Sequence, residues 1–184
     1  SLGRLLTHFR RFVLTRHAHP PRYFHTAVLR PADGRMYVFG GYAVTKRDSI
    51  VYFNDVWAYN FTAATFEEIA TTAVASSATA SEETSGVSAR GEARATAPTG
   101  PSPRSMHTAV IANDTMVMFG GSNPAEGNLG DTWILELRTR VWTELPQSDA
   151  GPSARNSATA TVVSGGAAMV LAFGEGNDGT VSDV

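Results

Sequence analysis

Three arginine residues stand at matching positions in three similar segments of this chain. Arg22 lies in PPRYFHTAVL, Arg104 in SPRSMHTAVI and Arg155 in PSARNSATATVV. A guanidinium group is always charged, and its paired N–H donors fit a carboxylate or a phosphate. The three arginines could therefore bind an anionic partner. Alternatively, each could brace a neighbouring unit of the fold through carbonyl groups or through an aspartate such as Asp55 or Asp131.

Residue types that support catalysis or metal binding are present, but they form no recognisable motif. The sequence contains no H-E-x-x-H, no G-x-S-x-G and no phosphate-binding loop. His25 and His107 occupy equivalent places in two of the similar segments, which favours a structural role. His17 and His19 lack an evident third ligand, and the absence of cysteine excludes thiolate zinc sites. We therefore predict no catalytic residue, no metal site and no cofactor.

The stretch 101–145 indicates which elements position these residues, because its pattern predicts four short strands. A first apolar run ends at the turn pair Asn113-Asp114, and the next run, MVMF, ends at a glycine pair. Glycine reaches backbone conformations that β-branched residues avoid, so such a pair marks the end of a strand. An alternating run at 132–137 and a last run around Trp142 complete the unit. One antiparallel sheet of this size cannot bury both faces, so it must pack against other units.

The same unit occurs upstream and again downstream. MYVFGG at 36–41 matches MVMFGG at 116–121, and an aspartate precedes the last aromatic residue by 11 positions in both copies. A third copy opens at 152 and continues through MVLAFGE. The spacing from Arg104 to Arg155 is 51 residues. Repeats of about this length are typical of solenoids and propellers.

With these repeats established, the chain resembles the kelch-repeat β-propellers. The resemblance implies an all-β fold of kelch-type propeller blades, each a four-stranded antiparallel sheet. The chain departs from the family pattern at Phe66, where tryptophan is usual, and in the third copy, which has Ala158 for histidine and Gly174-Glu175 for the double glycine. The residues that carry the resemblance are Arg22, His25, Gly40, Gly41, Asp55, Trp57 and Phe66 in one copy and Arg104, His107, Gly120, Gly121, Asp131 and Trp142 in the next.

The repeats predict an incomplete propeller. Propellers close with roughly four to eight blades, whereas this sequence of 184 residues holds two complete units and about half of another. An open arc would expose blade faces and strand edges. We therefore interpret the chain as a propeller fragment, with the remaining blades supplied by the missing part of the same chain.

The composition divides the chain further. Residues 1–19 combine arginines with apolar residues, which fits a basic lead-in helix or a remnant of a preceding blade. Blade 1 is expected at 20–70, blade 2 at 101–145 and a partial blade 3 at 146–184. Residues 71–100 are rich in alanine, serine, threonine and glycine and contain no aromatic residue. Such a segment buries too little apolar surface to offset its ordering entropy, so it predicts a disordered, low-complexity insertion.

The resemblance also suggests a binding face. In kelch propellers the first strand of each blade is innermost, and the loops entering it share a face with the loops between the second and third strands. By that resemblance Arg22, Arg104 and Arg155 would form a cationic rim. The long loop at 42–53 would lie on the same face, where Tyr42 and Tyr52 could contact a partner or cover a hydrophobic edge.

The expected function is a protein-interaction module or scaffold that presents this face to a protein or an acidic peptide. The alternative is the propeller portion of an enzyme whose catalytic residues lie outside this sequence, so the chain itself is predicted not to be an enzyme. The net charge of -2 does not favour a nucleic-acid partner, and no apolar run has the length of a membrane span. A cytoplasmic location is expected.

Overall fold

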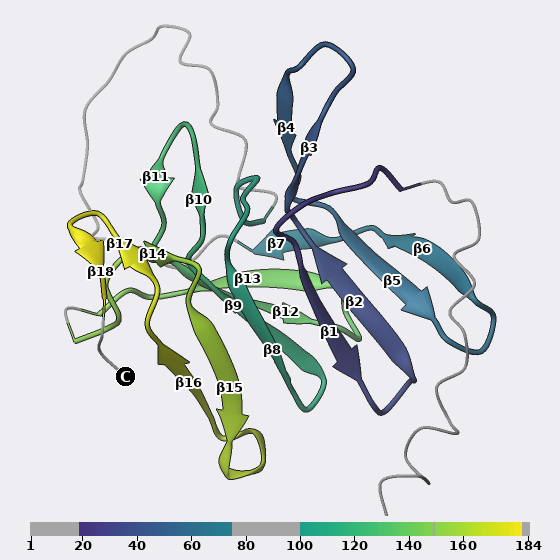
Figure 1. The fold of residues 1–184 in the computed structure, drawn as a ribbon. Helices are drawn as coiled ribbons and strands as arrows, with labels where there is room; N and C mark the ends of the chain where they lie inside the picture. Colours follow the sequence, from purple (N-terminus) through teal and green to yellow (C-terminus); the bar gives the residue numbers. More distant parts are fainter. Residues whose placement is uncertain (1–18, 75–99, 149, 182–184) are drawn as a thin grey trace, which may run out of the picture.

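The computed structural model describes residues 19–74, 100–148 and 150–181 (Figure 1). The predicted lead-in, except for its last residue, and residues 75–99 of the predicted insertion lie outside the described residues. Within the described residues, the regular elements are β-strands and the short 3-10 turn η3 (Ser164–Gly166). The predicted all-β class is therefore confirmed.

Blade 1 is a four-stranded antiparallel sheet with the order β1-β2-β5-β6. Its strands pair along their whole length, and five register pairs join each neighbouring couple. The centre of the sheet is buried because β2 and β5 contribute large apolar residues such as Phe39 and Val56. The strands are β1 (Thr26–Arg30), β2 (Arg35–Phe39), β5 (Val56–Asn60) and β6 (Thr65–Ile69).

Blade 2 repeats this sheet and adds a fifth strand. Its order is β8-β9-β12-β13, with β7 paired parallel to the outer edge of β13. The strands are β8 (Thr108–Ala112), β9 (Thr115–Phe119), β12 (Thr132–Glu136), β13 (Val141–Leu145) and β7 (Thr72–Val74).

Strand β7 departs from the prediction that residues 71–100 are disordered. The unpaired backbone groups on the outer edge of β13 can bind any extended segment, so a short strand needs little apolar surface of its own. Gly100, at the other end of the predicted insertion, also packs against the indole of Trp142. The two ends of this segment therefore belong to blade 2.

The main sheet of the third unit has two strands within the described residues, where that of blade 1 has four and that of blade 2 has five. A two-stranded sheet is formed by β15 (Thr159–Val163) and β16 (Ala168–Ala172), which occupy the places of β8 and β9 in blade 2. A small sheet of β14 (Arg155–Asn156), β17 (Glu175–Gly176) and β18 (Gly179–Thr180) lies at its end. The first strands β1, β8 and β15 contact one another in sequence, so they line the inner side of the arc.

The main core lies between the first two blades. Phe39 and Met116 are completely buried, and Trp142 on the outer strand of blade 2 is 1% exposed. The ring of Phe39 meets that of Trp142 edge to face, with centroids 5.2 Å apart. This contact shows that the two blades pack against each other. The buried core residues are Tyr37, Phe39, Val56, Ala58 and Ile69 of blade 1 and Met116, Met118, Trp133, Leu135, Leu137 and Trp142 of blade 2.

Two segments that the sequence indicated as loops are β-hairpins. In blade 1, β3 (Tyr42–Val44) pairs with β4 (Ile50–Tyr52), and in blade 2, β10 (Ser122–Asn123) pairs with β11 (Gly127–Asn128). Both hairpins project from the same end of the blades in Figure 1. We call this end the hairpin face.

Candidate interaction face

Arg104 is held inside blade 2 by an aspartate and by carbonyl groups. Its Nη1 and Nη2 atoms donate to the two carboxylate oxygens of Asp131 over 2.6 and 2.8 Å, and Nη1 also donates to the carbonyl of Gly120 over 3.1 Å. The indole Nε1 of Trp133 donates to the same carboxylate over 2.7 Å. With Arg104 only 1% exposed, this group ties the first, second and third strands of the blade together.

The same arrangement occurs in blade 1. Arg22 donates to both oxygens of Asp55 over 2.6 and 2.9 Å and to the carbonyl of Gly40 over 3.0 Å. Trp57 donates to Asp55 over 2.7 Å. The Arg22 side chain is 3% exposed, and its guanidinium lies 4.4 Å from the centroid of the Phe53 ring. The repeat therefore preserves a side-chain network as well as a pattern of strands.

Arg155 occupies the corresponding position in the third unit and is 1% exposed. It donates to the carbonyls of Phe173 and Ser153 over 3.2 and 3.0 Å and to the Ser153 hydroxyl over 2.8 Å. Its own carbonyl accepts the N–H of Gly121 in blade 2 over 3.0 Å. Arg155 thus contacts its own unit through its side chain and the preceding blade through its backbone.

The arginines were expected either to anchor a partner or to brace the fold. An anchor needs an exposed guanidinium group, whereas a brace can be buried. All three guanidinium groups are buried and bonded within their own units. Burial alone would raise the pKa of Asp131, but the hydrogen bonds and charge of Arg104 outweigh it and lower that pKa. The pKa of Asp55 is lowered against burial in the same way by Arg22 and Trp57. This geometry fits braces, although the side chains brace the strands of their own unit and not, as expected, a neighbouring one. It leaves no exposed cation at these positions for a partner's carboxylate.

The two repeated histidines occupy different environments. His107 is buried between the blades, where its Nε2 atom lies 2.8 Å from the hydroxyl of Thr26 and its ring meets Phe39 edge to face. Burial, with a smaller contribution from the charge of Arg104, lowers the pKa of His107 to about 3. His25 is more exposed, and partial burial followed by the charge of Arg22 lowers its pKa. The buried neutral imidazole of His107 is a structural group.

A chain of backbone hydrogen bonds joins the units beside these histidines. The N–H of Met106 donates to the carbonyl of Phe24 over 3.0 Å, and the N–H of Ser157 donates to the carbonyl of Met106 over 2.8 Å. All three residues have positive φ values, of 54°, 57° and 56°, which is uncommon for residues other than glycine. The link from one unit to the next is therefore made by the backbone in a strained conformation.

Four aromatic residues, two exposed and two partly buried, lie beside this chain of hydrogen bonds at the base of the β3–β4 hairpin. We define the aromatic cluster as Tyr23, Phe24, Tyr42 and Tyr52. Tyr23 and Phe24 are 61% and 53% exposed, and both rings lie within 6 Å of Tyr42, at 5.7 and 5.8 Å between centroids. The ring of Tyr42 also contacts that of Tyr52, its cross-strand partner, with centroids 5.5 Å apart. The predicted pair of tyrosines is therefore part of a larger surface.

Tyr23 and Phe24 were not identified from the sequence as binding residues, although a signal was present. They stand in the repeated segment where the second copy has Ser105 and Met106, so they interrupt an otherwise close match. Because the second copy forms the same blade without aromatic residues at these two positions, the fold does not require Tyr23 and Phe24 to be aromatic.

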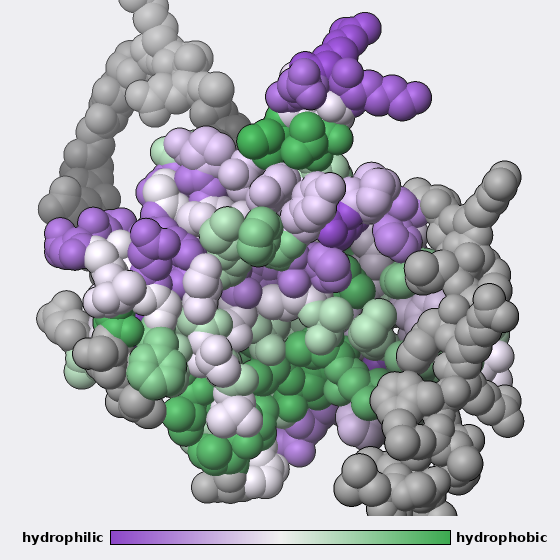
Figure 2. Space-filling model, viewed as in Figure 1, coloured by the Kyte–Doolittle hydropathy of each residue, from purple (hydrophilic) through white to green (hydrophobic). Residues whose placement is uncertain are grey.

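The β3–β4 hairpin extends the aromatic cluster outwards. Val44, Ile50 and Val51 on its strands are 52%, 55% and 43% exposed, and beyond them the turn carries Lys46 and Arg47. Figure 2 shows this sequence of properties as a hydrophobic stem beneath a strongly hydrophilic tip at the top of the molecule. We call Lys46 and Arg47 the basic tip. Neither forms an ion pair with any residue of the described ranges.

The corresponding hairpin of blade 2 has the opposite charge. Its turn carries Glu126, whose carboxylate accepts a hydrogen bond from Asn123 over 2.9 Å. The Asn123 side chain also accepts the N–H groups of Ala125 and Glu126 over 2.9 Å each. The turn of the blade 1 hairpin therefore has a net positive charge, since Lys46 and Arg47 outnumber Asp48, and that of blade 2 is negative.

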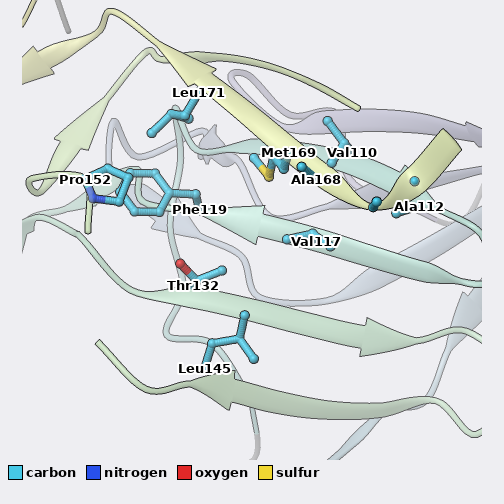
Figure 3. A pocket seen from close by; sticks show the side chains of 12 residues that line it. Val110, Ala112, Val117, Phe119, Thr132, Leu145, Pro152, Ala168, Met169 and Leu171 are labelled. Carbon is cyan, nitrogen blue, oxygen red and sulfur yellow. The ribbon is translucent and has the colours of Figure 1, made fainter. Parts of the chain in front are cut away.

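A groove of about 320 Å³ separates blade 2 from the third unit. Figure 3 shows Phe119, Val117 and Leu145 of blade 2 on one side and Met169 and Leu171 of β16 on the other. No ionisable side chain lines the groove. Its walls are therefore mostly apolar.

Further features of the described residues bear on alternative functions. Searching residues 19–74, 100–148 and 150–181 finds no group of three or more histidine and acidic side chains placed to hold a metal ion. Over the same ranges, no helix has the length and apolar character needed to cross a membrane.

Repeated four-stranded blades, glycine pairs and arginine–aspartate–tryptophan networks together define a β-propeller of the kelch type. Comparison with protein families agrees, because the family described as the KLHDC2/KLHL20/DRC7 Kelch-repeats domain matches residues 7–184. The chain therefore belongs to the kelch-repeat family.

Among solved structures, the chain is similar to one described as "Structure of YjhT". The two share a TM-score of 0.58 and 16% sequence identity over 84% of this chain. The match covers 45% of the other chain, so the present sequence spans less than half of that structure. At this identity the likeness shows the fold alone, which is an incomplete propeller.

Proposed function

We propose that this chain is part of a protein-interaction module whose hairpin face binds a protein or an acidic peptide. The observation that carries the proposal is the exposed aromatic cluster, which lies next to a basic tip without ion-pair partners in the described residues. Aromatic side chains dominate the energetics of protein interfaces because they bury a large area at low entropic cost. Unpaired cations favour an acidic partner and accelerate its association.

The roles of the charged residues are divided in this proposal. The buried arginines brace the strands that hold the aromatic cluster in place, and the exposed cations Lys46 and Arg47 attract the partner. Tyr42 and Tyr52 supply contact area at the base of the hairpin, together with Tyr23 and Phe24. The partner is expected to place its acidic residues over blade 1, because the blade 2 hairpin carries Glu126.

The proposal is tested by selecting binders from a random peptide library displayed on phage against the full chain. Enriched peptides should contain acidic residues next to apolar ones, and their affinity should be lost in the double variant Tyr42→Ala, Tyr52→Ala. Phe61→Ala provides a matched control, since Phe61 is also an exposed aromatic residue but lies in the β5–β6 turn. Failure to enrich acidic peptides, or equal binding by the tyrosine variant, would overturn the proposal.

A further inference from the structure

We propose that Ser49 is a phosphoacceptor site, and that its phosphorylation by a protein kinase selective for basic sequences weakens the binding of acidic partners at the hairpin face. The second half of this inference rests on the proposed function, whereas the first half concerns the serine alone. The inference rests on the residues of the β3–β4 turn, whose sequence is Thr45-Lys46-Arg47-Asp48-Ser49-Ile50.

The Ser49 hydroxyl is accessible and unoccupied. Ser49 is exposed, and its Oγ forms no hydrogen bond with a described residue, although its backbone N–H and carbonyl both bond to Thr45. The neighbouring hydroxyl differs, because Thr45 Oγ1 accepts the N–H groups of Arg47 and Ser49 over 3.3 Å each. Of the two hydroxyls in the turn, Ser49 is therefore the available nucleophile.

The turn can also reach an enzyme's active site. It stands at the outer end of a projecting hairpin, and every residue from Val44 to Val51 is exposed (Figure 2). The side-chain hydrogen bonds within the turn are exposed, as are the residues that form them. Such a segment opens locally at low free-energy cost, so it can adopt the extended form that a kinase cleft requires.

The residues around Ser49 favour a kinase with an acidic substrate cleft. Lys46 and Arg47 precede the serine by three and two positions, and Ile50 directly after it is 55% exposed. Cations before the hydroxyl can pair with carboxylates of the enzyme, and the exposed isoleucine can enter an apolar pocket. The blade 2 hairpin offers a contrast, because Ser122 is partly buried in β10 and has no cation in the three positions before it.

The transfer itself is ordinary phosphoryl chemistry with a nucleoside triphosphate as co-reactant. The Ser49 Oγ attacks the γ-phosphorus, and a new O–P bond forms as the bond from that phosphorus to the β,γ-bridging oxygen breaks. The nucleoside diphosphate leaves with the bonding electrons, and the hydroxyl proton passes to the base of the kinase. The product is phosphoserine, which carries about −1.5 to −2 charges near neutral pH.

The consequence for binding follows from charge. With Asp48, the turn that holds the basic tip has a net charge of +1, and a phosphate on Ser49, two residues from Arg47, outweighs it. An acidic partner then meets a neutral or negative tip in place of a cationic one. We expect the affinity for an acidic peptide to fall by about tenfold or more on phosphorylation.

The experiment treats the full chain with a kinase selective for basic residues before serine and a nucleoside triphosphate, then maps phosphate by mass spectrometry. Incorporation should occur at Ser49, disappear in Ser49→Ala, persist in Thr45→Ala and fall in the double variant Lys46→Ala, Arg47→Ala. Ser122 should remain unmodified. Absence of phosphate from Ser49 in the unaltered chain, or equal total incorporation in Ser49→Ala, would overturn the site.

The second arm measures the affinity of an acidic peptide selected on the hairpin face for the phosphorylated and the unmodified chain. A loss of about tenfold supports the regulatory half, whereas an unchanged affinity overturns it. If the unmodified chain is phosphorylated at Ser49 but yields no acidic binder, the proposed function fails and the phosphoacceptor site stands. The two failures are therefore distinguishable.

Discussion

The Nε2 atom of His107 in blade 2 lies 2.8 Å from the hydroxyl oxygen of Thr26 in blade 1. This contact joins the first residue of β1 to the residue that precedes β8, so it links two successive blades at their innermost strands. Because the imidazole is buried, with its pKa lowered to about 3, protonation would place an uncompensated charge in the blade interface.

Folding stability should therefore decrease as the pH falls below the ordinary histidine pKa. The folded pKa of His107 lies below its unfolded value of 6.5, so its contribution is fully present above pH 6.5 and is lost progressively towards about pH 3. His107→Gln should be less sensitive to acidification between about pH 7 and 4.5, measured as the free energy of unfolding in urea. Over that range Asp55 and Asp131 stay ionised, because both pKa values are lowered from 3.8. A variant as acid-sensitive as the unaltered chain would contradict this assignment.

Arg104→Ala should destabilise the fold by about 3 to 5 kcal/mol, because it leaves Asp131 partly buried without its counter-charge. Arg138→Ala is a matched control, since this arginine also pairs with an aspartate but its side chain is 73% exposed, and it should change stability little. Urea denaturation and peptide affinity should be measured together. If Arg104→Ala kept its stability within about 0.5 kcal/mol but lost the partner, the arginine would be an anchor and not a brace.

Trp142→Ala should cost about 3 to 5 kcal/mol of unfolding free energy, as expected for removal of a large buried ring. The indole is 1% exposed and contacts both Phe39 and Trp133. Phe66, the corresponding residue of blade 1, is only partly buried, so Phe66→Ala should cost less. A loss below about 1 kcal/mol for Trp142→Ala would be inconsistent with its place in the core.

Gly120→Ala should destabilise the chain much more than Gly34→Ala. Both glycines have nearly the same positive φ, 64° and 63°, so a side chain meets a similar backbone strain, of about 1 to 2 kcal/mol. A Cβ at Gly120 would lie 2.5 Å from the carbonyl oxygen of Arg155, whereas one at Gly34 meets nothing within 4 Å. The difference in unfolding free energy between the two variants measures the cost of the clash with the third unit. Equal losses would show that the close approach at Gly120 does not limit the side chain.

Binding of an acidic peptide should weaken in the double variant Lys46→Ala, Arg47→Ala, and the loss should shrink as salt concentration rises, because exposed charges are screened. Glu126→Ala on the blade 2 hairpin is the counterpart with opposite charge. It should leave affinity unchanged or increase it. Fluorescence anisotropy with a labelled acidic peptide measures both effects, and equal losses in the two variants would indicate a general effect on the face and not recognition by the basic tip.

Much of the fold could be predicted because the kelch units repeat their signals in register. The glycine pairs mark strand ends with positive φ values, which favour glycine, and the close approach at Gly120 leaves little room for a side chain. The same repetition pointed to Asp55 and Asp131 as bracing partners of the arginines, and both ion pairs are present. The residues that recur, the glycine pairs and the arginine–aspartate pairs, are those that hold the strands of each blade and pack one unit against the next.

The elements that the sequence did not predict are those that do not recur. Strand β7 is three residues long and gains its pairing from the edge of β13, which lies far away in sequence. The β3–β4 hairpin has exposed apolar residues on short strands, and such a run does not distinguish a hairpin from a loop. The burial of the arginines also depended on distant partners. Their sequence positions fitted an exposed anchor equally well.

The backbone chain through Phe24, Met106 and Ser157 has a consequence for how such a protein can diversify. At these three positions the units are joined through carbonyl and amide groups, so the side chain there can be an aromatic ring, a thioether or a hydroxyl. Assembly and surface chemistry are thereby uncoupled at this position. Evolution can alter the inner margin of the hairpin face one unit at a time without changing how the units join.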